Sequence, residues 1–350
     1  LEFKNSDKIK VIDLISFISS NNKNSNEILI KRLDEFNPDI VYIHNTWFKA
    51  NLGIFKILKK RDLIVFHKLH NYRYHCTNFF LSKNHFSDGN ICYKCGSIKK
   101  PRAIFNKYFQ DSYLKSLVIF LYNKKFYKIL FSYPIKILVM NEFHKKFLIK
   151  LGMKDKKIGI FYNPIEINKY PKNTYDPKSK TVVYAGRLTE GKGLIDLLET
   201  WTSSATEDLK LIIIGSGDLQ EHIKEKYKSN NITFTGPLSK KETLDFVMQS
   251  RAVITCTKSY EGHPRILSEA SSFGVPSIYP SFGGMNEYFP SNYPLTFEQF
   301  NYKELKYKIE SLHDVDLMKN LSEKVYFKSY DLLNEKSLLN RFQELVSSYE

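Results

Sequence analysis

Residues 181–280 alternate between short apolar runs and amphipathic stretches, and this alternation constrains the fold more than any other feature of the chain. The apolar runs are rich in β-branched residues and lack polar alternation, as in TVVYAG (181–186) and LKLIIIG (209–215). Strands of this kind, separated by helices, form a parallel sheet that is covered on both faces. The repeat therefore predicts a doubly wound α/β domain, whose ligands bind beyond the carboxyl ends of its strands. The predicted strands cover residues 181–186, 209–215, 231–236, 252–257 and 276–280, and the helices cover 193–201, 218–227, 240–250 and 264–273.

The first half of the chain has a noisier version of the same pattern. Strands are predicted at 39–45, 63–70, 134–141 and 157–164, and helices at 26–36, near 50–60 and at 102–130. A doubly wound domain usually opens with a strand and a Gly-rich turn, and neither begins this half. We therefore expect the first domain to be incomplete at its N-terminus, in keeping with a first residue that is not Met.

Two domains are expected in a chain of 350 residues. The Pro-, Asn- and Lys-rich segment 166–180 is the predicted linker region. The expected division is a first Rossmann-like domain at 1–165, a second at 166–330, and a C-terminal helix at 331–350 that packs back on the first domain.

Composition limits the environment and the partners. No apolar run approaches the roughly 18 residues that span a bilayer, and the first ten residues lack a signal-peptide pattern, which predicts a cytoplasmic protein. The net charge of +16 is uneven: residues 1–170 hold 31 Lys and Arg against 13 Asp and Glu, and residues 171–350 hold 22 against 24. A basic first half favours an anionic membrane surface, nucleic acid or a phosphate-bearing substrate, although the Lys-rich composition of the whole chain explains part of it.

Two cations and three glycines follow the first strand of the second half. Arg187 and Lys192 lie among Gly186, Gly191 and Gly193, at the carboxyl end of the strand 181–186. Charge-assisted hydrogen bonds from such cations suit a phosphate group, and glycines let a ligand approach the backbone. The alternative is an ordinary solvated loop, which would be the better interpretation of Arg187 alone.

The segment YEGHPRILSEASSF (260–273) combines a second anion site with two carboxylates. Pro264 suits the first turn of a helix, so that Gly262 and His263 precede a helix start whose backbone N–H groups face an anion. Glu261 stays in the loop and Glu269 lies inside the helix, where carboxylates can accept from a sugar hydroxyl and a ribose diol. This arrangement suits a nucleotide sugar. Helix-dipole compensation by Glu261 and surface exposure of Glu269 are the structural alternatives.

GRLTEGKGLIDLL, IIIGSGDLQ, NITFTGPLS and YEGHPRILSEASSFGVPSI, in this order and spacing, resemble the donor half of family 4 glycosyltransferases. NPDIVYIHN, HKLHNYRYHC and VMNEFHKKFLIKLG are similar to the acceptor half. The resemblance covers about residues 37–290 and implies the GT-B fold, with two Rossmann-like domains facing a cleft. It also implies retaining transfer from a nucleoside diphosphate sugar, in bacterial surface polysaccharide synthesis.

Carried over residue by residue, the resemblance implies that Arg187 and Lys192 neutralise the leaving diphosphate. It also implies that the backbone N–H groups of Gly262 and His263 donate hydrogen bonds to that diphosphate. Glu261 would orient the donor sugar and Glu269 would hold the ribose. Gly215, in the G-x-G turn of IIIGSGDL, is included as a binding residue, although such a turn is often only a tight connection. His70 matches a family histidine near the donor sugar, and a packed histidine at a strand end is its alternative. No cofactor is implied, and UDP is the expected nucleoside diphosphate of the donor.

Two other features leave alternatives open. Cys76, Cys92 and Cys95 form a pattern that zinc sites use, but the spacing is not diagnostic, so bound zinc is an alternative that we do not favour; Cys256 is expected to be a free thiol. The aromatic, basic segment 108–130 suits peripheral docking on the inner face of the plasma membrane, or simply a packed core. An inactive homologue that binds nucleotide and a basic nucleic-acid-binding protein are the alternative functions.

Overall fold

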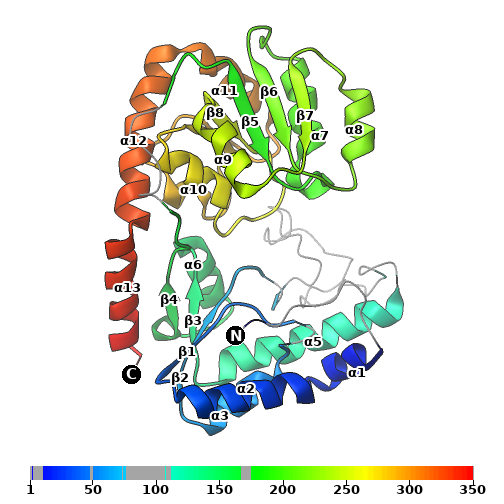
Figure 1. Ribbon diagram of the computed structural model, residues 1–350, viewed down its shortest axis with the longest axis vertical. Coiled ribbons are helices and arrows are strands. Elements are labelled where there is room, and N and C mark those ends of the chain that lie inside the picture. Colours follow the sequence, from blue (N-terminus) through cyan, green and yellow to red (C-terminus); the bar gives the residue numbers. More distant parts are fainter. Residues whose placement is uncertain are drawn as a thin grey trace. The chain divides into compact units, whose positions relative to one another are not determined.

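The computed structural model describes residues 2, 11–47, 50–72, 74–75, 107, 112–166 and 175–349, with only the backbone described at 11–14. The chain divides into two compact units (Figure 1). One comprises Leu1–Phe161 together with Leu345–Glu350, and the other comprises Tyr162–Glu344. The division therefore falls at Phe161, a few residues before the expected linker, and again inside the last helix.

The first unit is built on a parallel sheet in the order β1-β2-β3-β4. Its central strand β3 has the sequence KILV and is buried along its whole length, which is why its residues do not alternate between apolar and polar. The strands are β1 (Ile40–Ile43), β2 (Ile64–Lys68), β3 (Lys136–Val139) and β4 (Ile158–Ile160), and the helices are α1 (Val11–Ser19), α2 (Lys23–Phe36), α3 (Gly53–Lys60), α5 (Tyr113–Ser132) and α6 (Glu142–Lys150).

Local capping explains where several of these helices begin and end. The side chain of Asn22 accepts a hydrogen bond from the N–H of Ser25 and starts α2, and Asn37 ends that helix with a φ of 43°. The side chain of Asn141 accepts from the N–H of His144 and starts α6 directly after β3. Asn141 thus fixes the turn after β3, at the carboxyl edge of this sheet, and Asn37 fixes the turn before β1, at the amino edge.

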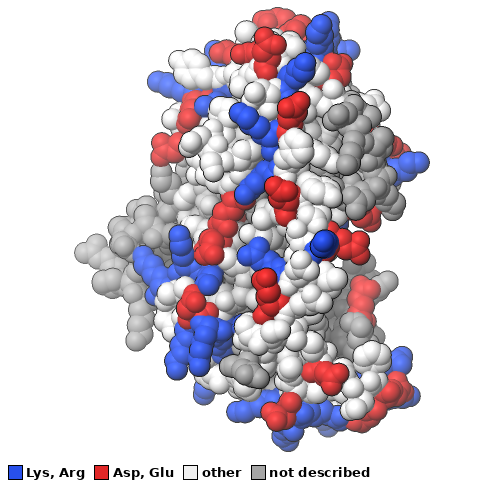
Figure 2. Space-filling view, turned by 90° about the vertical axis from the view of Figure 1, so that its left-hand side faces the viewer, with Lys and Arg blue, Asp and Glu red and all other residues white. Residues whose placement is uncertain are grey.

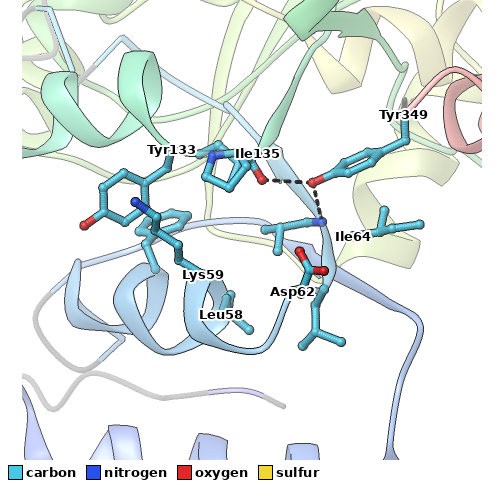
Figure 3. Close-up of a pocket in the computed structure, with 11 residues that line it drawn as sticks. Leu58, Lys59, Asp62, Ile64, Tyr133, Ile135 and Tyr349 are labelled. Atoms are coloured by element: carbon cyan, nitrogen blue, oxygen red, sulfur yellow. Dashed lines mark hydrogen bonds between the residues drawn. The ribbon is translucent and has the colours of Figure 1, made fainter.

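The last residues of the chain belong to the first unit. The Nζ of Lys136 donates to the carbonyl and hydroxyl oxygens of Ser348, and the Tyr349 hydroxyl accepts from the N–H of Val65 and donates to the carbonyl of Pro134. Tyr349 covers one side of a cavity of about 230 Å³ at the amino ends of β2 and β3 (Figure 3). This edge of the sheet is opposite to the edge at which parallel sheets bind their ligands.

The second unit has a six-stranded parallel sheet in the order β10-β9-β8-β5-β6-β7. The strands are β5 (Thr181–Ala185), β6 (Lys210–Ile214), β7 (Ile232–Gly236), β8 (Ala252–Ile254), β9 (Ser277–Pro280) and β10 (Thr296–Phe297). The helices are α7 (Leu194–Thr202), α8 (Gln220–Lys226), α9 (Lys240–Met248), α10 (Arg265–Ser272), α11 (Tyr302–Glu310), α12 (Val315–Leu333) and α13 (Glu335–Ser347). The predicted doubly wound α/β fold is confirmed.

The element boundaries differ from the predicted ones in instructive places. The strand predicted at 252–257 ends at Ile254, because the chain leaves the sheet there to form the loop that precedes α10. Residue 330, where the second domain was expected to end, lies inside α12. Helix α1 was not predicted, since a short apolar run such as VIDLISFIS does not distinguish a helix from a strand.

Figure 2 shows the charged side chains on one face of the protein. On the face shown in Figure 2, which carries α12 and α13, Lys and Arg side chains are interspersed with Asp and Glu.

Among the helices that the structure describes, none combines the length and the apolar character needed to cross a bilayer.

Candidate donor-binding site

The strand order of the second unit brings two loops together at one edge of the sheet. Strand β5 pairs with β6 on one side and with β8 on the other, and the chain passes from β5 to β7 in one direction and from β8 to β10 in the opposite direction. The loops after β5 and β8 therefore leave the sheet at a topological switch point, where doubly wound folds bind ligands. Residues 186–193 form the first loop and residues 255–264 form the second.

Close backbone contact joins these two loops. Gly193 has a φ of 65°, and a Cβ at this position would lie 1.9 Å from the carbonyl oxygen of Cys256. The N–H of Lys258 donates to the carbonyl of Gly191 over 3.0 Å. Gly193, which was predicted for ligand approach, is thus also needed for the loops to approach each other.

Two ion pairs cross between the loop regions in opposite directions. Lys192 in the first loop pairs with Glu261 in the second, and both side chains are about three-quarters buried. In the reverse direction, Lys258 of the second loop lies 2.6 Å from Asp196 at the start of α7. The hydroxyl of Thr257 also donates to Glu261 over 3.2 Å. The structure therefore brings the predicted residues Lys192 and Glu261 into direct contact.

Sequence analysis did not predict Thr257, Lys258 or Asp196. Thr257 and Lys258 follow β8 at the carboxyl edge, which is the signal that could have identified them. Asp196 lies in the first turn of α7 and gave no signal of its own, because its partner is 62 residues further along the chain.

Arg187 is the exposed cation of this edge. Its carbonyl accepts a hydrogen bond from the buried Tyr184 hydroxyl at 3.0 Å, which fixes the backbone from which the guanidinium projects. Among the described residues, no carboxylate lies within ion-pair distance of that guanidinium. Arg187 therefore has its planar set of N–H donors available for a bidentate anion.

The start of α10 supplies the second part of the site. Its N-cap residue is Pro264, which has no side-chain acceptor, so no side chain caps the helix. The His263 ring stacks on Tyr288 at 4.3 Å, and its Nε2 lies 2.7 Å from the Ser268 hydroxyl. The Tyr288 hydroxyl donates to the carbonyl of Gly262 over 3.4 Å. The imidazole is therefore part of the packing that holds the turn, and His263 would reach an anion through its backbone.

Glu269 lies in α10 with only 12% of its side chain exposed. The Nε of Arg265 is 3.5 Å from its carboxylate and the Nζ of Lys240 is 3.9 Å away, both longer than a charge-assisted hydrogen bond. Burial raises the pKa of Glu269, against the opposing effect of Arg265 and Lys240. A buried carboxylate whose cation partners lie this far away can accept from a pair of hydroxyl groups. Glu269 and Glu261 thus have different cation partners.

Gly215 is required by the backbone around it. Its φ is 136°, a Cβ would lie 1.9 Å from the carbonyl oxygen of Gly186, and its N–H donates to the carbonyl of Gly236. The N–H that a ligand would use is therefore part of the sheet's hydrogen bonding. The steric requirement explains this glycine without a ligand.

We expect Gly215→Ala to lower the free energy of unfolding by about 3 kcal/mol or more, because the Cβ meets backbone that cannot move aside. Gly236→Ala is the matched control: its φ is 76°, but nothing lies within 4 Å of the added Cβ. It should cost only the left-handed strain of about 1–2 kcal/mol. Chemical denaturation of both variants measures the difference, and equal losses would show that the contact with Gly186 is unimportant.

His70 belongs to the first unit, at the carboxyl end of β2. Its Nε2 lies 3.0 Å from the Nδ1 of His44, the residue after β1, and the rings stack. Burial, the nearby Lys68 and His44 lower the pKa of His70 to about 4. Burial and Lys68 also lower the pKa of His44, so both rings favour the neutral form. A single proton lies between the two nitrogens, and either ring can donate it.

The predicted cysteine cluster cannot be placed. Cys76, Cys92 and Cys95 lie outside the described residues. Within the described ranges, no group of three His, Cys, Asp or Glu side chains is arranged to hold a metal ion. Cys256 is a buried free thiol, and burial raises its pKa, so it has little thiolate character.

Parts of the chain are similar in sequence to known proteins. Residues 166–326 match the family model for glycosyl transferases group 1. The amylovoran biosynthesis glycosyltransferase AmsD of Erwinia amylovora is 27% identical over 149 residues, which cover 41% of this chain and 42% of that protein. The GDP-mannose:cellobiosyl-diphosphopolyprenol alpha-mannosyltransferase of Xanthomonas campestris is 27% identical over 130 residues, covering 35% and 34% of the two chains. The aligned regions thus span less than half the length of these relatives.

Solved structures show the same fold over nearly the whole chain. Anabaena HepE in complex with UDP and glucose aligns with a TM-score of 0.64 at 14% identity, covering 92% of this chain and 81% of that one. Sucrose-phosphate synthase from Thermosynechococcus elongatus aligns with a TM-score of 0.68 at 14% identity, covering 95% and 78%. The predicted GT-B fold is confirmed.

Proposed function

We propose that the protein is a glycosyltransferase that moves a sugar from a nucleoside diphosphate sugar, with UDP as the expected nucleoside diphosphate, to a saccharide or lipid-linked acceptor. The proposed transfer retains the anomeric configuration and contributes to polysaccharide synthesis. The observation that carries this proposal is the switch point of the second unit, where Arg187, Lys192 and the uncapped start of α10 occupy two adjacent loops. The match of residues 166–326 to a glycosyltransferase family supports it.

The proposed roles follow from the charge that develops during transfer. When the bond between the anomeric carbon and the diphosphate oxygen breaks, negative charge builds on the diphosphate, and fixed cations and N–H donors stabilise that charge. Arg187 and Lys192 are the cations, and the backbone of Gly262 and His263 provides the donors at the helix start. Glu261, which holds Lys192 in the free protein, accepts from a hydroxyl of the donor sugar once the diphosphate takes over Lys192.

Glu269 is the proposed partner of the ribose. Its position inside α10 is removed from the first turn of the helix, so its charge faces hydroxyl groups rather than the diphosphate. Because only the ionised form accepts two hydroxyl donors, and because its pKa is raised, nucleotide affinity should fall at a higher pH than for an ordinary glutamate. His70 remains the proposed residue of the first unit, acting as a neutral imidazole.

A donor panel tests the proposal. UDP-, GDP- and ADP-sugars are screened by thermal shift, and the best donor is followed by NMR for release of the nucleoside diphosphate and for the anomeric configuration of the product. A ligand at about 100 Kd should stabilise the wild type by about 2.7 kcal/mol, and Glu269→Gln distinctly less. GDP is included because one relative's name specifies a GDP-mannose donor.

The two parts of this experiment have separate outcomes. Inversion of the anomeric centre would contradict the retaining mechanism while leaving the transfer intact. Stabilisation without turnover of any donor would favour a nucleotide-binding homologue without activity. No stabilisation by any nucleotide would contradict the proposed site itself.

A further inference from the structure

Large apolar side chains are exposed together on two helices of the first unit. Helix α1 packs beside α5 (Figure 1), and the exposed residues are 44% to 67% accessible. We call this surface the α1–α5 patch; it consists of Ile15 and Ile18 on α1 and Tyr113, Leu114, Leu117 and Leu121 on α5. Single exposed apolar residues are ordinary, but clusters of this kind mark interaction surfaces.

The packing of the two helices holds the patch in place. Phe17 of α1 stacks on Tyr122 of α5 at 4.3 Å, and the Nζ of Lys125 donates to the carbonyl of Ile18 over 2.6 Å. The ring stacking uses the inward side of the helices, since Phe17 and Tyr122 are almost fully buried, and the Lys125 hydrogen bond ties the helices together at the surface. The exposed residues are therefore a second apolar surface, in addition to the core that the helices already share.

Charge accompanies the apolar side chains on α5. The helix contains four lysines and no acidic residue in its 20 positions. Leu114, Leu117 and Leu121 follow one helical stripe, and the exposed Lys124 and Lys128 continue that stripe at the same spacing.

We propose that the α1–α5 patch docks the protein on an anionic lipid bilayer, with the leucines and isoleucines in the boundary between headgroups and acyl chains. A helix with an apolar stripe and lysines beside it, but too polar to span, lies in the membrane interface, where lysines pair with anionic headgroups. A protein partner with an acidic surface, or a second copy of the chain, could also cover this apolar area. We favour a lipid surface because the lysines that extend the stripe complement a uniformly negative bilayer. This docking goes beyond the proposed transfer and does not depend on it.

Vesicle flotation tests the docking in the absence of donor and acceptor. The probes are vesicles of phosphatidylcholine alone and vesicles with about one-third phosphatidylglycerol, at low and high salt. The wild type should partition onto the anionic vesicles about tenfold or more above the neutral ones and should be released by salt. Leu114→Ser, Leu117→Ser and Leu121→Ser combined, and separately Lys124→Gln with Lys128→Gln, should each reduce that partitioning about tenfold or more.

The apolar control is matched in exposure, and the lysine control is matched in spacing. Phe327→Ser with Leu339→Ser removes apolar side chains that are 61% and 55% exposed on α12 and α13, and Lys324→Gln with Lys328→Gln removes two lysines of α12 spaced by four residues. Both controls should bind vesicles as the wild type does. The docking is overturned if the patch variants bind as these controls, if neutral and anionic vesicles bind equally, or if light scattering shows that the patch variants convert a dimer into a monomer.

Circular dichroism and thermal unfolding check that the variants fold as the wild type does. The substituted positions are exposed apart from the half-buried Lys328, and none belongs to the core, so the variants should unfold as the wild type does. Because no nucleotide takes part in flotation, failure here would leave the proposed transfer standing, and failure of the donor panel would leave the docking standing.

Discussion

Replacing Lys192 by Met is expected to lower kcat/KM for sugar transfer by about 10²- to 10³-fold, the range found when one fixed donor to a developing anion is removed. The physical reason is the position of the ammonium group. Lys192 leaves the sheet after β5, is held by Glu261 from the loop after β8, and is only 26% exposed, so its charge acts in a partly desolvated setting. Steady-state kinetics with the best donor of the panel gives the result.

Two further variants separate a binding role from loss of folding. Lys226→Met removes another ion-paired lysine of the same unit, which pairs with Glu199 on α7, away from the switch point, and should change kcat/KM by no more than about twofold. Lys192→Arg keeps the charge and should recover part of the activity. If Lys192→Met is no worse than Lys226→Met, Lys192 does not act on the diphosphate.

Two buried histidines are expected to lower the unfolding free energy of the first unit by about 4 kcal/mol between about pH 7.5 and pH 5, and the half-buried His70, whose pKa is also lowered, adds to this loss. His67 and His144 are 1% and 0% exposed, and burial lowers their pKa values to about 4 and about 3. Below the ordinary pKa of about 6.5, these histidines bind protons in the unfolded chain but stay neutral in the folded chain. The free energy of unfolding therefore has its full value above that pH and falls as the pH decreases. Each imidazole contributes about 2 kcal/mol over the interval.

Substitution of one histidine checks the assignment. His144 contacts the Tyr74 hydroxyl at 2.8 Å, a contact that an amide can replace. His144→Gln should therefore reduce the loss between the two pH values by about 2 kcal/mol, and His222→Gln, at an exposed position of α8, should not change it. Guanidinium unfolding followed by Trp47 fluorescence in a Trp201→Phe background reports on the first unit alone, since the chain has two tryptophans. An unchanged pH dependence in His144→Gln would contradict the assignment.

The strands could be predicted from the sequence because a strand that is buried on both faces consists almost entirely of apolar residues. LKLIIIG and KILV have no polar face, and such runs form strands of a covered parallel sheet. The position of Arg187, Lys192, Gly262 and His263 at strand ends could also be predicted, since parallel strands place their carboxyl ends at one edge.

Pairing between the loops could not be predicted, because it depends on strand order. Lys192 and Glu261 are 69 residues apart in the sequence, and they meet because β8 lies beside β5 rather than beyond β7. The same holds for Lys258 and Asp196. The reason for a glycine is equally hard to predict. The sequence shows a glycine at 215, but only the structure shows that the Gly186 carbonyl excludes a side chain there.

A crystal structure of the protein with UDP is the most direct test of the proposed convergence of two loops on one diphosphate. We expect phosphate oxygens within about 3.2 Å of the Lys192 ammonium and of a backbone N–H between residues 262 and 266, with the ribose hydroxyls on Glu269. A diphosphate bound elsewhere, with Lys192 still paired only to Glu261, would contradict the account.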